Sequence, residues 1–73
     1  MLDVKIEYDD KFTESQQDGF NDLYEACVYA FDLADKHSHD IPNDHGFPLW
    51  VHIFQESKKE LSISIIRGGF VAR

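Results

Sequence analysis

The amino-acid sequence predicts a two-layer α+β domain in the order βαββ, in which one amphipathic helix packs on a small mixed or antiparallel sheet containing a C-terminal hairpin. Three observations lead to this prediction. Apolar residues alternate over residues 2–8, recur at spacings of three and four over 20–34, and alternate again in the last third of the chain. We expect the 73 residues to form one domain, residues 1–73, and a domain of this size buries only about 60% of the surface that its unfolded chain exposes.

The first strand is predicted over residues 2–8, LDVKIEY. The side chains of Leu2, Val4, Ile6 and Tyr8 fall on one face, and charged side chains fall on the other. This alternation is typical of a strand that buries one face against the core.

The helix is predicted over residues 13–36. Thr13 and Gln16 have the spacing of a capping box, although Gly19 allows a later start. The helix should end at Lys36 or His37, because cations interact favourably with the C-terminal end of the helix dipole. Its apolar face comprises Phe20, Leu23, Tyr24, Cys27, Phe31 and Ala34.

A long loop over residues 37–48 follows, rich in Pro, Gly, Asp and Asn. It is longer than the usual connection of about 4–6 residues, which is often a sign of function.

The hairpin strands are predicted over residues 49–56 and 61–67. Pairing Gln55 with Leu61 sets Ile53 opposite Ile63 and Val51 opposite Ile65, so that the aliphatic side chains share the core face. The sequence after residue 67 contains Gly68 and Gly69, which predict a bend or bulge before a short strand or a tail.

The composition is strongly acidic, with fourteen Asp and Glu against seven Lys and Arg and a formal net charge of -7. Direct binding to nucleic acid or to an anionic membrane is disfavoured, because each phosphate contact needs a cation. A basic protein partner is favoured, and the alternative is that the acidity only keeps the protein soluble. The single cysteine excludes an intramolecular disulfide, and we see no signal peptide or membrane span, so we expect a cytoplasmic protein.

An acidic stripe is expected on the outer face of the predicted helix. It comprises Glu14, Asp18, Asp22, Glu25, Tyr29 and Asp32. Like charges at this spacing destabilise an isolated helix, so the stripe favours a role in binding, as a mimic of the phosphate line of DNA. The alternative is a solvated face that serves solubility.

The outer face of the hairpin is the second candidate surface. The predicted register leaves Trp50, His52 and Phe54 on it. Aromatic side chains on an open surface are typical anchors for a partner or for a homodimer. The alternative is that the long loop or the C-terminal residues cover this face.

The loop histidines His37, His39 and His45 are weak metal candidates, since imidazole and carboxylate ligands suit zinc but the spacing matches no usual zinc signature. A pH-sensitive loop is a further alternative. We expect no cofactor and no catalysis. Cys27 falls on the apolar helix face, and Ser62 and Ser64 near His52 lie on a flat sheet without an oxyanion hole.

The leading hypothesis is a small acidic protein-binding module. It would inhibit a nucleic-acid-handling enzyme or toxin by occupying its basic surface. Phage-encoded inhibitors, immunity proteins and antitoxins share this size and charge balance, which is an analogy of composition. The alternatives are a self-associating module that pairs through Trp50 and Phe54, and a metal-binding module that uses the loop histidines.

Overall fold

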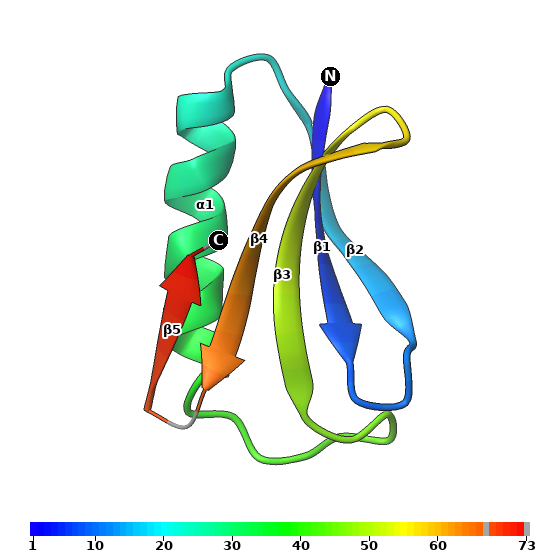
Figure 1. Cartoon of the computed structure of the whole chain (residues 1–73), viewed down its shortest axis with the longest axis vertical. Helices are drawn as coiled ribbons and strands as arrows, with labels where there is room; N and C mark the ends of the chain where they lie inside the picture. The colour runs from blue at the N-terminus through cyan, green and yellow to red at the C-terminus, as the bar shows by residue number, and fades with distance from the viewer. Residues whose placement is uncertain (67, 73) are drawn as a thin grey trace.

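The computed structural model describes residues 1–66 and 68–72, and within this part of the chain it contains one helix and five strands (Figure 1). The helix α1 (Leu23–His37) packs on one face of an antiparallel sheet with the strand order β2-β1-β3-β4-β5. The strands are β1 (Leu2–Tyr8), β2 (Thr13–Phe20), β3 (Pro48–Gln55), β4 (Lys58–Ile66) and β5 (Gly69–Ala72). The predicted α+β fold, with its one helix and its C-terminal hairpin, is confirmed, and β2 and β5 extend the predicted sheet on its two sides.

Residues 13–20 form strand β2, so the prediction that the helix starts at Thr13 is wrong. The segment TESQQDGF has a single apolar residue, Phe20, and therefore cannot present an apolar helix face. It pairs instead as an edge strand with β1, through a hairpin turn in which Lys11 adopts a positive φ of 74°. The helix N-cap is Asp22, whose carboxylate accepts a hydrogen bond of 3.0 Å from the backbone N–H of Tyr24.

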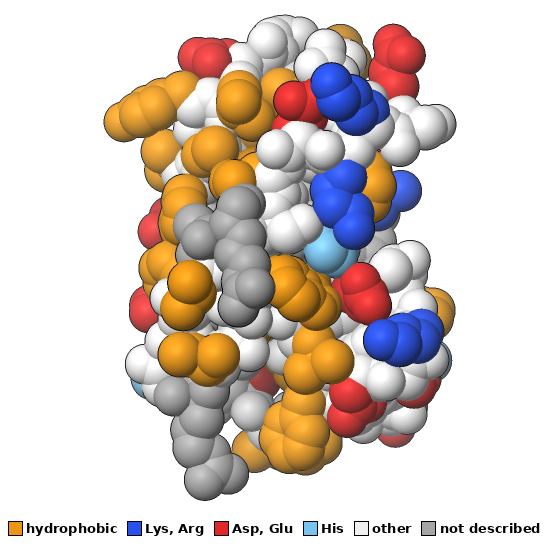
Figure 2. Space-filling view, viewed as in Figure 1, with side chains coloured by type: hydrophobic (Ala, Val, Ile, Leu, Met, Phe, Trp, Pro, Cys, Tyr) orange, Lys and Arg blue, Asp and Glu red, His pale blue; other side chains and the backbone are white. Residues whose placement is uncertain are grey.

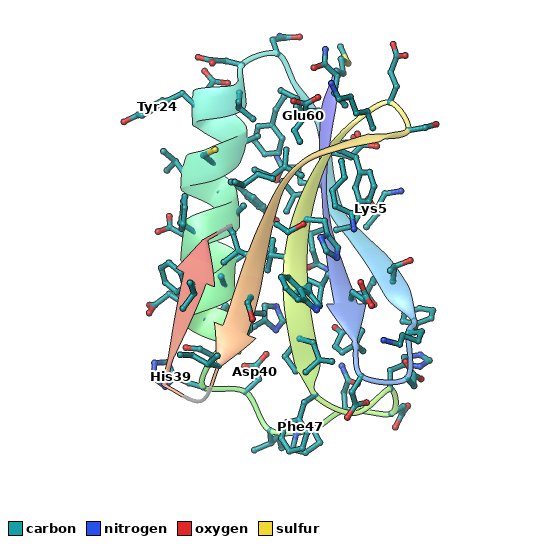
Figure 3. All side chains as sticks on the ribbon, in the orientation of Figure 1. Lys5, Tyr24, His39, Asp40, Phe47 and Glu60 are labelled. Carbon is teal, nitrogen blue, oxygen red and sulfur yellow. The ribbon has the colours of Figure 1, made fainter. Side chains whose placement is uncertain are left out.

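The helix ends at His37, as the cations at Lys36 and His37 predict. Its buried face is a row of alanines at Ala26, Ala30 and Ala34, all with 0% exposure. Cys27 and Phe31 pack beside this row, whereas Leu23 and Tyr24 are exposed. The buried face is therefore narrower than the pattern predicts, and Tyr24 points away from the sheet (Figure 3).

The β3–β4 register differs from the predicted one by two residues. Val51 pairs with Ile63, and Ile53 pairs with Leu61. A bulge after Ile53 and a turn at Glu56, which has a φ of 58°, set this pairing. Because side chains alternate with a period of two, the same aliphatic side chains still face the core. The strand bounds are close to the predicted 49–56 and 61–67, although the last predicted residue, Arg67, lies outside the described residues.

The core lies between α1 and the sheet. Its largest fully buried side chains are Val4, Ile6, Val51, Ile53 and Ile63. Among the described residues, no helix is long and apolar enough to cross a membrane.

Candidate functional site

The acidic residues that were expected on one helical stripe are divided between two elements. Glu14 and Asp18 lie on β2, so the prediction of a single helical stripe is wrong. Asp22, Glu25, Tyr29 and Asp32 keep their helical or capping positions. The ring centroids of Phe20 and Tyr29 are 5.4 Å apart, so β2 and this flank of α1 are neighbours.

We call the five carboxylates of this region the acidic side. It comprises Glu14, Asp18, Asp22, Glu25 and Asp32. Glu14 pairs opposite Ile6 and so projects from the sheet face that carries the helix. Glu25 and Asp32 lie four and three residues from Tyr29, on the helix flank that faces β2.

The ion pairs in the described part of the chain lie elsewhere. They join His37 to Asp40, His45 to Asp10, His52 to Glu7 and Lys58 to Glu60. None of them involves a carboxylate of the acidic side. Asp22 is occupied as the N-cap, and Glu14 accepts a hydrogen bond of 2.9 Å from the Gln16 side chain. The carboxylates of the acidic side therefore form no ion pair within the described residues, and the nearest cation on the helix is Lys36, one turn from Asp32.

The outer face of the sheet carries the predicted aromatic row, and α1 does not cover it. Strand β5 passes in front of α1 in Figure 1, so the space-filling view shows this outer face (Figure 2). In this view hydrophobic side chains gather over α1 and β5 and at the lower end, and Lys and Arg lie on the opposite side. Trp50 and Phe54 are half-buried. The alternative expected from the sequence was that the long loop or the C-terminal residues cover this face. Within the described residues they do not cover it.

His52 is the exception on this face, since it is only 4% exposed. Its Nδ1 lies 2.8 Å from Oγ of Ser62, and its Nε2 lies 2.9 Å from Oε1 of Glu7. The Trp50 ring is stacked beside it at 5.8 Å, and the Phe54 ring meets it edge-on at 5.9 Å. The sequence suggested that the His52 ring is available to a partner. The ring is instead enclosed by its neighbours in the sheet.

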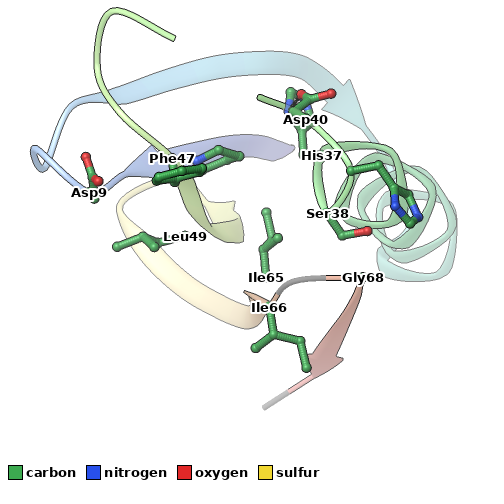
Figure 4. Close-up of a pocket in the computed structure, with 11 residues that line it drawn as sticks. Asp9, His37, Ser38, Asp40, Phe47, Leu49, Ile65, Ile66 and Gly68 are labelled. Atoms are coloured by element: carbon green, nitrogen blue, oxygen red, sulfur yellow. Dashed lines mark ion pairs between the residues drawn. The ribbon is translucent and has the colours of Figure 1, made fainter. Parts of the chain in front are cut away.

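The contact between Ser62, His52 and Glu7 brings together a hydroxyl, an imidazole and a carboxylate, as nucleophilic catalysis requires. Neither the cavity where α1 ends and β3 begins (Figure 4) nor the one beside Tyr29 is lined by these three residues. The network instead satisfies the polar atoms of a buried ring on an open sheet.

The predicted metal candidates are separated. His37 ends the helix and contacts Asp40, whereas His45 stacks on Phe12 with ring centroids 3.7 Å apart. Among the described residues, no group of three His, Cys, Asp or Glu side chains is placed to hold a metal ion.

A contact between the side chains of His45 and Asp10 joins the long loop to the β1–β2 turn. The sequence analysis did not predict this contact. The His45 Nδ1 lies 2.7 Å from Oδ2 of Asp10. The pKa of Asp10 is lowered, first because its carboxylate accepts a hydrogen bond from the Phe12 backbone N–H, and then by His45. The pKa of the neighbouring Tyr8 is raised by burial.

Cys27 is half-buried, and burial together with the charge of Asp22 raises the pKa of its thiol. A thiol with a raised pKa is a poor nucleophile at neutral pH. The structure thus agrees with a packing role for this cysteine.

Comparison with known proteins gave no match to a family model, to a curated protein or to a solved structure. The proposals that follow therefore depend on the geometry and charge of this chain.

Proposed function

We propose that this protein is an acidic protein-binding module that recognises a basic protein through its acidic side. The observation that carries the proposal is the set of five carboxylates on β2 and α1 that form no ion pair within the described residues. Asp22 and Glu25 suit the N-terminal end of the helix dipole, whereas Glu14, Asp18 and Asp32 bring no such stabilisation. A cationic partner would neutralise them.

The expected partner is a nucleic-acid-handling enzyme or toxin, which this protein would antagonise by occupying its phosphate-binding surface. The formal net charge of -7 raises the rate of encounter with a cationic surface. Phe20 and Tyr29, which are half-buried between β2 and α1, supply apolar contact area between the carboxylates. The carboxylates are divided between two neighbouring elements, a strand and a helix with its N-cap, in place of the single line expected from the sequence.

The test is capture of a partner from nuclease-treated lysate of the native host, followed by competition between this protein and nucleic acid for that partner. The binding variant reverses Asp18, Glu25 and Asp32 to Lys and leaves the N-cap Asp22 intact. The matched control reverses Asp35, Asp44 and Glu56 to Lys, which changes the net charge equally but lies outside the acidic side. We expect a basic protein to be held by the wild type and the control, to be lost by the binding variant, and to be displaced by nucleic acid.

Equal loss with both variants would show that only net charge matters. If the wild type, the binding variant and the control all hold the partner, the acidic side is not its binding surface. If the partner is held through the acidic side but is not displaced by nucleic acid, the acidic side remains the binding surface. The antagonist role is then contradicted.

Self-association through the outer sheet face is the second candidate function. It is favoured by two exposed aliphatic side chains beside the aromatic row, Ile66 at 52% and Val71 at 47% exposure. Sedimentation equilibrium at micromolar concentration should then show a dimer that Trp50→Ala weakens. A monomer at all concentrations would reject this candidate.

A further inference from the structure

Strand β2 forms one edge of the sheet, and β5 forms the opposite edge (Figure 1). Within the described residues β2 pairs with β1 alone. Its residues are exposed, apart from the half-buried Gln16 and Phe20. The outer side of an edge strand presents backbone N–H and C=O groups to which a further extended segment can add by hydrogen bonding.

The β1–β2 turn identifies which backbone groups of β2 point away from β1. The Tyr8 N–H donates a hydrogen bond of 2.8 Å to the Phe12 carbonyl, and Glu14 follows Phe12 by two residues. Hydrogen-bonded and non-hydrogen-bonded pairs alternate in an antiparallel ladder. The backbone groups of Glu14 therefore point to β1, whereas the N–H and C=O groups of Thr13 and Ser15 point to the free edge.

The side chains along this edge are acidic on the sheet face that carries the helix. Glu14 projects to that face, and Asp18 follows it on β2. Neither carboxylate forms an ion pair within the described residues. On the other face β1 contributes Lys5 and Glu7, which have opposite signs, and Lys11 lies in the turn that precedes β2.

The charges on β2 select which kind of segment can add to it. Charged side chains and bulges on edge strands commonly prevent pairing between copies, and pairing of two copies through β2 would bring carboxylates together. The same carboxylates favour a strand with Lys or Arg side chains, because opposite charges on neighbouring strands attract. Arg67 and Arg73, which lie outside the described residues, adjoin β5 in the sequence, at the opposite edge of the sheet.

We propose that an extended basic segment of the partner, with Lys or Arg at alternate positions, adds to β2 as a further strand. Paired residues of neighbouring strands place their side chains on the same face of the sheet. The cations therefore lie beside Glu14, while the residues between them bond to the backbone of Thr13 and Ser15. This inference rests on the proposed function, since it states how the basic partner is recognised.

The experiment is a titration of the 15N-labelled protein with three synthetic peptides of equal length, followed through amide NMR signals and hydrogen exchange. The first peptide alternates Lys with Thr. The second replaces each Thr with Pro, which keeps the charge but removes the N–H groups that strand addition needs. The third replaces each Lys with Glu, which keeps the N–H groups but reverses the charge.

We expect the Lys–Thr peptide to shift the amide signals of Thr13 and Ser15 in a saturable way. At saturation it should slow the exchange of these two amides with water by at least about fivefold, because they become hydrogen-bonded to the added strand. The Lys–Pro and Glu–Thr peptides should not slow their exchange.

Two variants test the two parts of the site. Ser15→Pro removes an N–H from the free edge, and proline is tolerated on the free side of an edge strand. Glu14→Gln removes the carboxylate, and its control, Asp44→Asn, removes the same charge in the long loop. The Lys–Thr peptide should bind at least about fivefold more weakly to Ser15→Pro, about threefold more weakly to Glu14→Gln, and equally well to Asp44→Asn.

Equal protection by the Lys–Thr and Lys–Pro peptides, or binding of the Lys–Thr peptide without protection, would overturn this inference. Either result would show attraction of cations without strand addition and would leave the acidic side as the partner surface. No saturable shift, or equal loss in Glu14→Gln and Asp44→Asn, would overturn it as well. Failure of the proposed function is seen separately, in the capture experiment, and spectra without peptide verify that each variant is folded.

Discussion

At the scale of single residues, His52 is a polar ring that is almost fully buried on the open face of the sheet, so its nitrogens need hydrogen-bond partners. Both ring nitrogens have partners, Ser62 and Glu7, from the two neighbouring strands. Trp50 and Phe54 flank the ring on its own strand. The outer face therefore has a small polar centre of its own, which links β1, β3 and β4.

His52→Ala should destabilise the protein by about 2–3 kcal/mol, because it leaves a void between two aromatic rings and removes both hydrogen bonds. Urea denaturation measures the change. Ser64→Ala is the matched control on β4, at a side chain that forms no hydrogen bond with the described residues, and should change stability by less than about 0.5 kcal/mol. Equal effects of the two substitutions would contradict a special role for His52.

Asp10 should make stability depend on acid pH. Its pKa is lowered in the folded protein, so its contribution to stability is present above the ordinary carboxyl pKa of 3.8 and is lost as the pH falls through the lower folded pKa. Asp10→Asn keeps an oxygen that can accept from the Phe12 N–H but removes the charge.

The wild type should therefore be more stable than Asp10→Asn at pH 6, and the difference should vanish as the pH falls through the lowered pKa of Asp10. Thermal unfolding of both proteins across this range measures it. A difference that persists at the lowest pH would show that the carboxylate charge is not its source.

Among the elements, the long loop passes close to the Asp9 side chain at Gly46. Gly46 has a φ of 85°, and a Cβ at this position would lie 1.9 Å from Oδ1 of Asp9. Gly19 in β2 has the same φ but open space around it. Alanine substitution at each glycine therefore distinguishes the stability lost to backbone conformation from the stability lost to contact with Asp9.

Gly19→Ala should cost about 1 kcal/mol of backbone strain, and Gly46→Ala should cost somewhat more, because the exposed Asp9 side chain must also turn away from the new methyl group. Chemical denaturation of both variants measures the difference. If the two costs are equal, Asp9 must move away from the new methyl group without penalty.

The helix is held on the sheet by its alanine row. Ala30 is the middle residue of this row and is 0% exposed. Ala30→Leu should destabilise the protein by about 1–3 kcal/mol through overpacking, although leucine is a good helix former. Val28→Leu on the exposed side should be neutral or slightly stabilising. A neutral Ala30→Leu, judged from denaturation midpoints, would mean that the interface between α1 and the sheet can expand.

At the scale of the whole molecule, the acidic side chains repel one another at low salt even from opposite sides of the protein, because the Debye length exceeds its radius. The radius of gyration is 11.3 Å, whereas the Debye length is about 30 Å at 0.01 M and below about 10 Å at 0.15 M. With a formal net charge of -7, raising NaCl over this range should stabilise the protein by about 1 kcal/mol, or roughly 4–8 °C in Tm.

The variant with Asp18, Glu25 and Asp32 reversed to Lys should show a smaller salt effect, because less repulsion remains to be screened. Calorimetry at several salt concentrations measures both proteins. A Tm that falls with added salt would show that attractive ion pairs outweigh the repulsion.

The sequence determined the parts of this protein in which side-chain periodicity is strong. The alternation of Leu2, Val4 and Ile6 identified β1 and its buried face, and the cations at Lys36 and His37 located the end of the helix. The core face of the hairpin was also predictable, because a shift of two residues moves no side chain to the other face.

Only the tertiary structure decided the rest. The polar segment TESQQDGF has no periodicity of its own, and it becomes a strand because the edge of β1 offers backbone hydrogen bonds. That change divides the predicted acidic stripe between two elements. The contacts of His52 with Glu7 and of His45 with Asp10 join residues 45 and 35 positions apart. Local patterns report which face of an element is buried, whereas pairing partners and site geometry follow from contacts between distant residues, which no local pattern contains.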